Sequence, residues 1–171
     1  MEKEIKIYNY GFDELKTYLF VSLFVIGNIL LPQLCHLIPN GGKIFLPIYF
    51  FTLVASYKFG FKVGLMTAVF SPIVNNLLFG MPVLSILPAI LIKSVVLAIA
   101  STTIANKTNK VSLLSLLAVI LIYQIIGTLA EWAMTSSFFI AVQDFRIGIP
   151  GMIIQLFGCY LILSQTDKTN S

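Results

Sequence analysis

The chain has 171 residues, of which 58% are hydrophobic and 11% are charged, and its mean hydropathy is +0.95. Eleven basic and seven acidic side chains cannot cover a globule of 19.0 kDa, since a soluble domain uses about 25% charged residues for its surface. This excludes a soluble enzyme, a disordered chain and a nucleic-acid-binding protein, and the net charge of +4 is interpreted as a signal of membrane topology.

The first 16 residues carry charges of both signs and lack the basic stretch followed by an apolar stretch of a signal peptide. Two interpretations of this segment stay open. It is either a cytoplasmic tail, or an amphipathic stretch that lies on the membrane surface through Tyr8, Tyr10, Phe12 and Leu15.

The charge-free stretches that follow predict an all-α polytopic membrane protein with six transmembrane helices, since a spanning helix needs about 20 mainly apolar residues. A break at Gly80-Met-Pro82 separates the third helix from the fourth, and a loop at Asn106–Lys110 separates the fourth from the fifth. We expect segment 17–164 to form this domain and 165–171 to form a cytoplasmic tail. The expected helices are Thr17 to about Cys35, 44–57, 63 to about 79, about Pro82 to Ala105, Val111 to Met134 and Ile147 to Ser164.

Basic residues in alternate loops predict the orientation, because cytoplasmic loops are enriched in Lys and Arg. The side of the N-terminus carries eight of them, and the other side carries only Lys43 and Arg146. Both termini are therefore expected in the cytoplasm. The eight are Lys3, Lys6, Lys16, Lys58, Lys62, Lys107, Lys110 and Lys168.

With this topology, the polar side chains within the helices gather in the outer half of the bundle. Polar groups inside a bilayer usually face a cavity, and a one-sided cluster favours a pocket over a channel, which needs a polar lining along its whole length. A ring of the ligand is expected to stack on Trp132 or Tyr123. The candidate substrate-binding residues are Asn28, His36, Asn75, Asn76, Lys93, Gln124, Glu131, Trp132 and Gln155.

Several of these residues also have a structural interpretation, and the sequence leaves the choice open. Lys93 and Glu131, the only carboxylate expected to be buried, either pair with each other or contact the ligand. Asn75 and Asn76 either bind the ligand or form hydrogen bonds between helices. His36 is otherwise a loop residue, and Trp132 is otherwise an aromatic residue of the membrane interface.

Motifs of catalysis and of metal or nucleotide binding do not occur in the sequence. It has no Walker motif, no H-E-x-x-H, no G-x-S-x-G and no Cys/His cluster. Its two cysteines, Cys35 and Cys159, lie within apolar stretches, which argues against a disulfide framework. We expect no enzymatic activity, no cofactor and no metal.

The third predicted helix carries small residues at a spacing of four, at Gly60, Gly64 and Ala68, which permits close helix packing. The stretch from Phe59 through Asn75 and Asn76 to Gly80 resembles the third helix of the substrate-binding S components of energy-coupling factor (ECF) vitamin transporters. The loop Leu37-Ile-Pro-Asn-Gly-Gly42 is similar to the loop that covers the pocket in that family. The family's first helix often carries Ala-x-x-x-Ala to dock the coupling subunit; here Ser22 and Gly27, or another face, would take that role.

This resemblance implies a multi-pass protein of the bacterial cytoplasmic membrane that captures a small water-soluble vitamin or related micronutrient at the outer face. A transmembrane coupling subunit and two cytoplasmic ATPase subunits would power its delivery to the cytoplasm. Two other functions stay open, namely a stand-alone small-molecule carrier and a non-transport membrane assembly protein.

Overall fold

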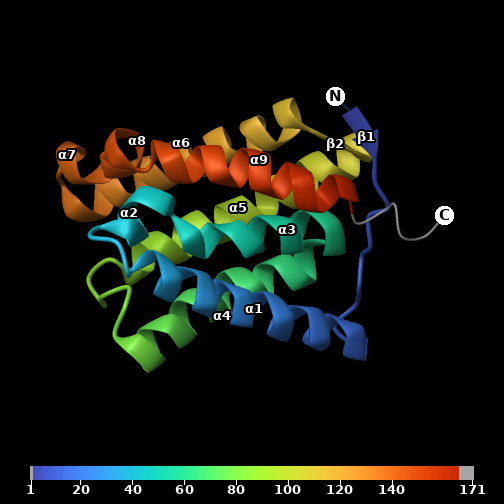
Figure 1. Cartoon of the computed structure of the whole chain (residues 1–171), viewed down its shortest axis with the longest axis horizontal. Coiled ribbons are helices and arrows are strands. Elements are labelled where there is room, and N and C mark those ends of the chain that lie inside the picture. Colours follow the sequence, from blue (N-terminus) through green and yellow to red (C-terminus); the bar gives the residue numbers. More distant parts are fainter. Residues whose placement is uncertain (1, 166–171) are drawn as a thin grey trace.

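In a computed structural model, which describes residues 2–165, the chain forms mainly helices lying side by side along the long axis of the molecule (Figure 1). Four helices in this part of the chain are long and apolar enough to cross a membrane, by length and composition. A fifth apolar helix, α9, is shorter, with 17 residues. The long helices are α1 (Leu15–Cys35), α4 (Phe61–Phe79), α5 (Leu87–Thr108) and α6 (Leu113–Thr135), and α9 spans Ile149–Gln165.

The second predicted span, 44–57, is not one continuous helix. The structure divides it into α2 (Gly41–Phe45), the 3-10 helix η1 (Pro47–Tyr49) and α3 (Phe50–Phe59). The division falls at Leu46, whose φ of 48° is left-handed; the proline after it disfavours a right-handed helical conformation at that residue. With ten residues, α3 is about 15 Å long, so the prediction of six spans is untested at this helix.

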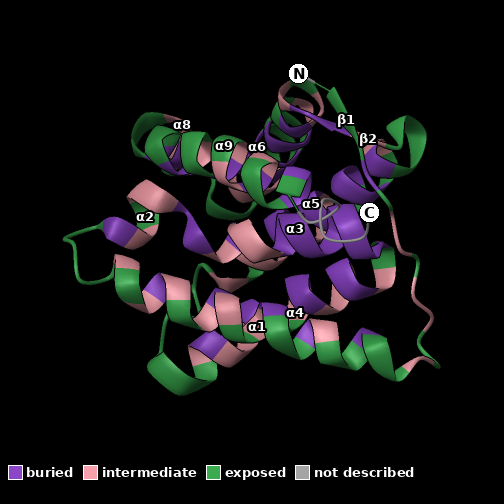
Figure 2. Ribbon diagram, turned by 45° about the vertical axis from the view of Figure 1, so that its right-hand side comes forward, coloured by how far each residue is buried: buried purple, intermediate pink, exposed green. Residues whose placement is uncertain are grey.

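Helix α3 forms the centre of the bundle. It contacts α1, α4, α5 and α9, and every residue from Thr52 to Phe59 is buried. Figure 2 shows this central position, with buried ribbon at α3 and exposed positions on the outer side of α1. A short helix is stable there because neighbouring helices cover it on all sides.

The small residues of α4 face α3. A Cβ atom on Gly64 would lie 2.7 Å from the Cα of Ser56, and Ala68 is completely buried. This face therefore packs inside the bundle, which is the role of small residues at close helix contacts.

The N-terminal segment is extended and packs on one end of the bundle. Strand β1 (Glu2–Glu4) pairs antiparallel with β2 (Lys110–Ser112), with Lys3 opposite Val111. Beyond the strand, Tyr8 stacks on Phe59. The predicted loop 106–110 is correspondingly shorter, because α5 continues to Thr108. The fold is thus helical with one small two-stranded ribbon in the described chain.

The outer surface of the bundle is strongly apolar, as expected for contact with lipid acyl chains. On α1 and α6, large apolar side chains follow one another along the exposed face, whereas a soluble protein would place polar residues there. These faces fit a membrane-embedded protein. The exposed residues include Leu19, Leu23, Ile26, Leu30 and Leu34 on α1, and Leu121, Ile125, Ile126 and Leu129 on α6.

Strand β1 and the C-terminal end of α9 lie at the same end of the bundle, and α2, α7 (Phe138–Ala141) and α8 (Gln143–Ile147) lie at the other (Figure 1). The placement of the two termini relative to a membrane stays a prediction. Of the predicted tail 165–171, residues 166–171 lie outside the described residues, as does Lys168.

Candidate functional site: a pocket at one end of the bundle

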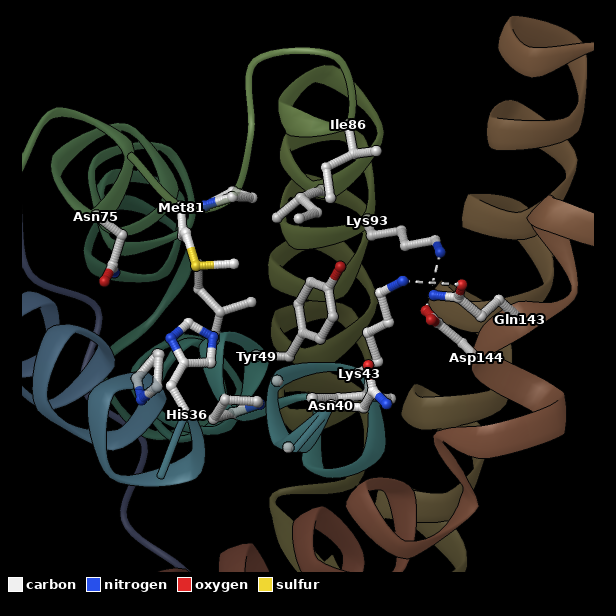
Figure 3. Close-up of a pocket in the computed structure, with 18 of the residues that line it drawn as sticks. His36, Asn40, Lys43, Tyr49, Asn75, Met81, Ile86, Lys93, Gln143 and Asp144 are labelled. Atoms are coloured by element: carbon white, nitrogen blue, oxygen red, sulfur yellow. Dashed lines mark hydrogen bonds and ion pairs between the residues drawn. The ribbon is translucent and has the colours of Figure 1, made fainter. Parts of the chain in front are cut away.

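A pocket of about 440 Å³ opens at the end of the bundle that lies away from β1. It lies between the C-terminal ends of α1, α4 and α6, the N-terminal half of α5, and the short elements α2, η1 and α8 (Figure 3). Its size is within the range of small-molecule sites, about 300–1,000 Å³. Most of its wall is apolar, with contributions from Pro32, Ile48, Met81, Pro82, Ile86, Ala89 and Ile90.

The loop after α1 forms one rim of the pocket. His36, Pro39 and Asn40 all line it, and Asn40 has a φ of 58°, a left-handed conformation in which asparagine is enriched. A Cβ on Gly41 would overlap the carbonyl oxygen of Cys35, so the turn requires glycine at that position. The sequence prediction placed a loop here that covers a pocket, and the structure places this loop at the pocket's edge.

A cluster of three charged side chains forms the inner wall. The Lys93 ammonium group on α5 lies 2.5 Å from Glu131 Oε2 on α6 and 2.9 Å from Asp144 Oδ2 on α8. The side chains of Lys93, Glu131 and Asp144 are 4%, 13% and 11% exposed. Two carboxylates thus share one ammonium group, and the cluster keeps one formal negative charge.

Asp144 shows that the prediction of Glu131 as the only buried carboxylate is wrong. We expected Asp144 in the outer loop between the last two spans. Instead, α7 and α8 fold over the end of the bundle and bring Asp144 to 8% exposure.

Two further polar side chains line the pocket and keep unused hydrogen-bonding capacity. Asn75, which is 2% exposed, donates both amide hydrogens, to the carbonyl oxygens of Asn28 and Ser71 at 2.9 Å each. Its Oδ1 atom has no partner among residues 2–165. Tyr49 is also 2% exposed, and Figure 3 shows its hydroxyl group pointing into the pocket between Met81 and Lys93.

The structure thus brings four of the predicted site residues, His36, Asn75, Lys93 and Glu131, to the pocket. Lys93 and Glu131 do form the ion pair that the sequence left as one alternative, and both also line the cavity. Of the polar lining residues that were missed, Tyr49 and Asp144 are the most buried.

Two other predicted site residues, Asn28 and Asn76, form hydrogen bonds to other parts of the chain. The Asn28 amide group donates to the hydroxyl groups of Thr52 and Ser71, at 2.9 and 3.0 Å, and its Oδ1 accepts from the Phe51 amide. Asn76 donates to the carbonyl oxygen of Pro82 at 2.7 Å. Asn28 does not line the pocket, but its carbonyl oxygen accepts a hydrogen bond from Asn75 and so helps to fix the Asn75 amide group.

Gln124, Gln155 and Trp132 also lie outside the pocket lining. Gln155 accepts from the Tyr123 hydroxyl group at 2.8 Å, and Gln124 donates to that hydroxyl at 3.2 Å. Tyr123 is completely buried, so it offers no face to a ligand. Trp132 is 45% exposed and packs edge-on against Phe138. The pocket's own aromatic side chains are Tyr49 and His36.

Gly127 on α6 provides a test of how tightly the Lys93 side chain is held. A Cβ there would overlap Lys93 Cγ and lie 3.1 Å from Cε. We expect Gly127→Ala to displace the ammonium group from its carboxylates and to cost about 1–3 kcal/mol, the usual cost of overpacking. Guanidinium unfolding in detergent measures the cost. A loss smaller than that of Gly158→Ala, whose Cβ would meet only the Phe50 ring, would contradict it.

The chain matches no protein-family model, no curated protein and no solved structure.

Proposed function

We propose that this chain is the membrane-embedded substrate-binding subunit of an ECF-type importer, capturing a small water-soluble vitamin or related micronutrient at the outer face of a bacterial cytoplasmic membrane. The observation that carries the proposal is the pocket itself. It combines an apolar wall with a few buried polar groups that have free hydrogen-bonding capacity, which is the usual composition of a small-molecule site.

A binding site is favoured over a channel because the bundle is packed solid next to the pocket. One helical turn further into the bundle from Tyr49 and Lys93 lie Leu53 and Leu97, and both are completely buried. A channel would need polar lining along its whole length. The packing therefore supports capture at one end.

The direction of capture follows from the predicted orientation. The pocket opens at the end opposite β1, so cytoplasmic termini would place it at the outer face. Delivery to the cytoplasm would use a transmembrane coupling subunit and two ATPase subunits. Ser22 and Gly27 are the positions on α1 at which the coupling subunit could dock. A Cβ on Gly27 would lie 2.8 Å from the Phe51 ring inside the bundle, whereas Ser22 is exposed. We therefore assign docking to the Ser22 side of α1 or to another helix.

Native mass spectrometry of the gently purified protein tests the proposal. We expect a small molecule to be retained by the wild type and lost in Ala89→Phe, which fills the pocket wall at a residue that is 6% exposed. Ala133→Phe is the matched control, because Ala133 is exposed on α6. ATPase and coupling subunits should co-purify from native membranes.

Two outcomes would contradict the proposal and favour the other functions. Uptake of the retained molecule into liposomes by this chain alone would indicate a stand-alone carrier. A protein that binds no small molecule, and whose pocket-filling variant behaves like the control, would indicate an assembly protein.

A further inference from the structure

We propose that the ligand of this pocket carries a cationic nitrogen group, such as a primary ammonium or amidinium group, which binds beside the carboxylates of Glu131 and Asp144. This inference rests on the proposed function and specifies the chemistry of its substrate. The substrate class is a compact, partly apolar organic cation, or a zwitterion whose cationic end enters first.

The charge of the inner wall is the first argument. Lys93 contacts two carboxylates, and all three side chains are at least 87% buried, so water screens the extra negative charge poorly. A second cation beside Glu131 and Asp144 would balance it. An anionic ligand reaching for Lys93 would meet both carboxylates at the same place.

The second argument is the direction of the hydrogen bonds on the opposite wall. Both amide hydrogens of Asn75 are already donated, to Asn28 and Ser71, so the amide cannot turn round without losing them. Its buried Oδ1 is left without a partner among the described residues and can only accept. Because both of its N–H groups are already used, Asn75 offers no donor to an anionic group of a ligand.

Asn75 and the charged cluster lie on opposite sides of one cavity. Figure 3 shows Asn75 on one side, Lys93 and Asp144 on the other, and the Tyr49 hydroxyl group between them. That hydroxyl can donate or accept, so it suits either a second nitrogen or an oxygen of the ligand. The apolar wall, including Met81 and Ile86, would contact the body of the ligand.

The basic residue at the rim does not reverse this preference. Lys43 is exposed, and its ammonium group donates to Gln143 Oε1 at 3.4 Å. Charge at a solvated rim is screened by water and salt, whereas the carboxylates lie inside. Lys43 therefore suits a polar or anionic group at the outer end of the ligand.

Three probes of one ring and different charge test the inference on the whole protein in lipid nanodiscs. They are 3-(aminomethyl)pyridine, 3-pyridinemethanol and nicotinate, which carry an ammonium, a hydroxyl and a carboxylate group. Trp132, the one tryptophan of the chain, follows Glu131 and reports binding by its fluorescence. We expect the ammonium probe to bind at least tenfold more tightly than either of the others.

Single carboxylate variants assign this preference to the cluster. Asp144→Asn and Glu131→Gln each leave Lys93 with one carboxylate, so the inner wall becomes neutral, and we expect the preference for the ammonium probe to fall below threefold. Glu4→Gln is the matched control, because Glu4 is exposed in β1 at the other end of the bundle, and it should keep the tenfold preference.

The outcomes separate this inference from the proposed function. Tighter binding of nicotinate or of the alcohol, or a retained molecule in native mass spectrometry without a basic nitrogen, would overturn the inference and leave the proposed function standing. Binding of none of the probes together with no retained molecule would overturn both.

Discussion

Replacing Lys93 by methionine is expected to lower the free energy of unfolding by about 3–5 kcal/mol, the usual cost of removing one partner of a buried ion pair. The substitution keeps the apolar stem of the side chain but removes the ammonium group that lies 2.5 Å from Glu131 and 2.9 Å from Asp144. Two buried carboxylates would then face each other without a counter-charge. Guanidinium unfolding in detergent, followed by Trp132 fluorescence, measures the loss.

The compensating variants show whether charge is the cause. The double variant Lys93→Met/Glu131→Gln should recover only part of the loss, because Asp144 still lacks a partner. The triple variant with Asp144→Asn in addition should recover most of it. Glu131→Gln or Asp144→Asn alone should cost less than Lys93→Met, since each leaves a balanced pair. Full recovery in the double variant would show that Asp144 is not part of the cluster.

The fate of Lys93 and Glu131 shows how far the sequence could predict the site. Both were identified because ionisable side chains inside apolar helices are costly and need a partner or a cavity. The sequence could not decide between pairing and ligand contact. In the structure the two alternatives are compatible, because the ion pair itself forms part of the pocket wall.

Asp144 was missed because its position depends on tertiary packing. Sequence reasoning assigns charged residues between spans to water-exposed loops, and Asp144 follows a span boundary. Only the folding of α8 over the end of the bundle, with its contacts to α2 and α9, brings this carboxylate next to Lys93. No periodicity in residues 138–147 specifies that placement.

Asn28 and Gln155 are predicted site residues that do not line the pocket. Both are buried amides inside apolar helices, as the site argument required, yet their hydrogen-bonding partners are other parts of the bundle: Thr52 and Ser71 for Asn28, and Tyr123 and Leu46 for Gln155. The sequence places these amides within apolar helices, but it does not specify the direction of a side chain around the helix. The apolar helices of this chain have little amphipathic pattern to specify that direction, because lipid and core are both apolar.

The four long helices were predicted well and the second span was not, and the length and continuity of the apolar stretches explain both outcomes. Apolar stretches of about 20 residues predicted α1, α4 and α6 within two residues, and the stretch through Lys93 predicted α5 with a start at Pro82 instead of Leu87. Pro47 and the left-handed Leu46 interrupt the shorter stretch. The small residues of α4 were predicted to permit close packing but did not identify their neighbour. The structure identifies it as α3, which leads to the second large effect.

Adding a single methyl group at Gly64 is expected to destabilise the bundle severely. The new Cβ would lie 2.7 Å from the Cα and 3.2 Å from the backbone nitrogen of Ser56. Backbone atoms of a buried helix cannot move aside as a flexible side chain does, so we expect Gly64→Ala to cost about 3 kcal/mol, the upper end of the usual overpacking range. Gly64→Leu should prevent accumulation of folded protein.

Gly80→Ala is the matched control, because it makes the same chemical change where space is open. A Cβ there would meet nothing within 4 Å, and only its φ of 67° is unfavourable, which costs roughly 1–2 kcal/mol. Unfolding of both variants in detergent, together with binding of the retained molecule, gives the comparison.

If Gly64→Ala folds and binds like the wild type but abolishes uptake in cells, this face of α4 docks a coupling subunit instead of packing on α3. If the two alanine variants lose stability equally, backbone strain and not close helix contact explains the loss, and α3 and α4 are further apart than the structure shows.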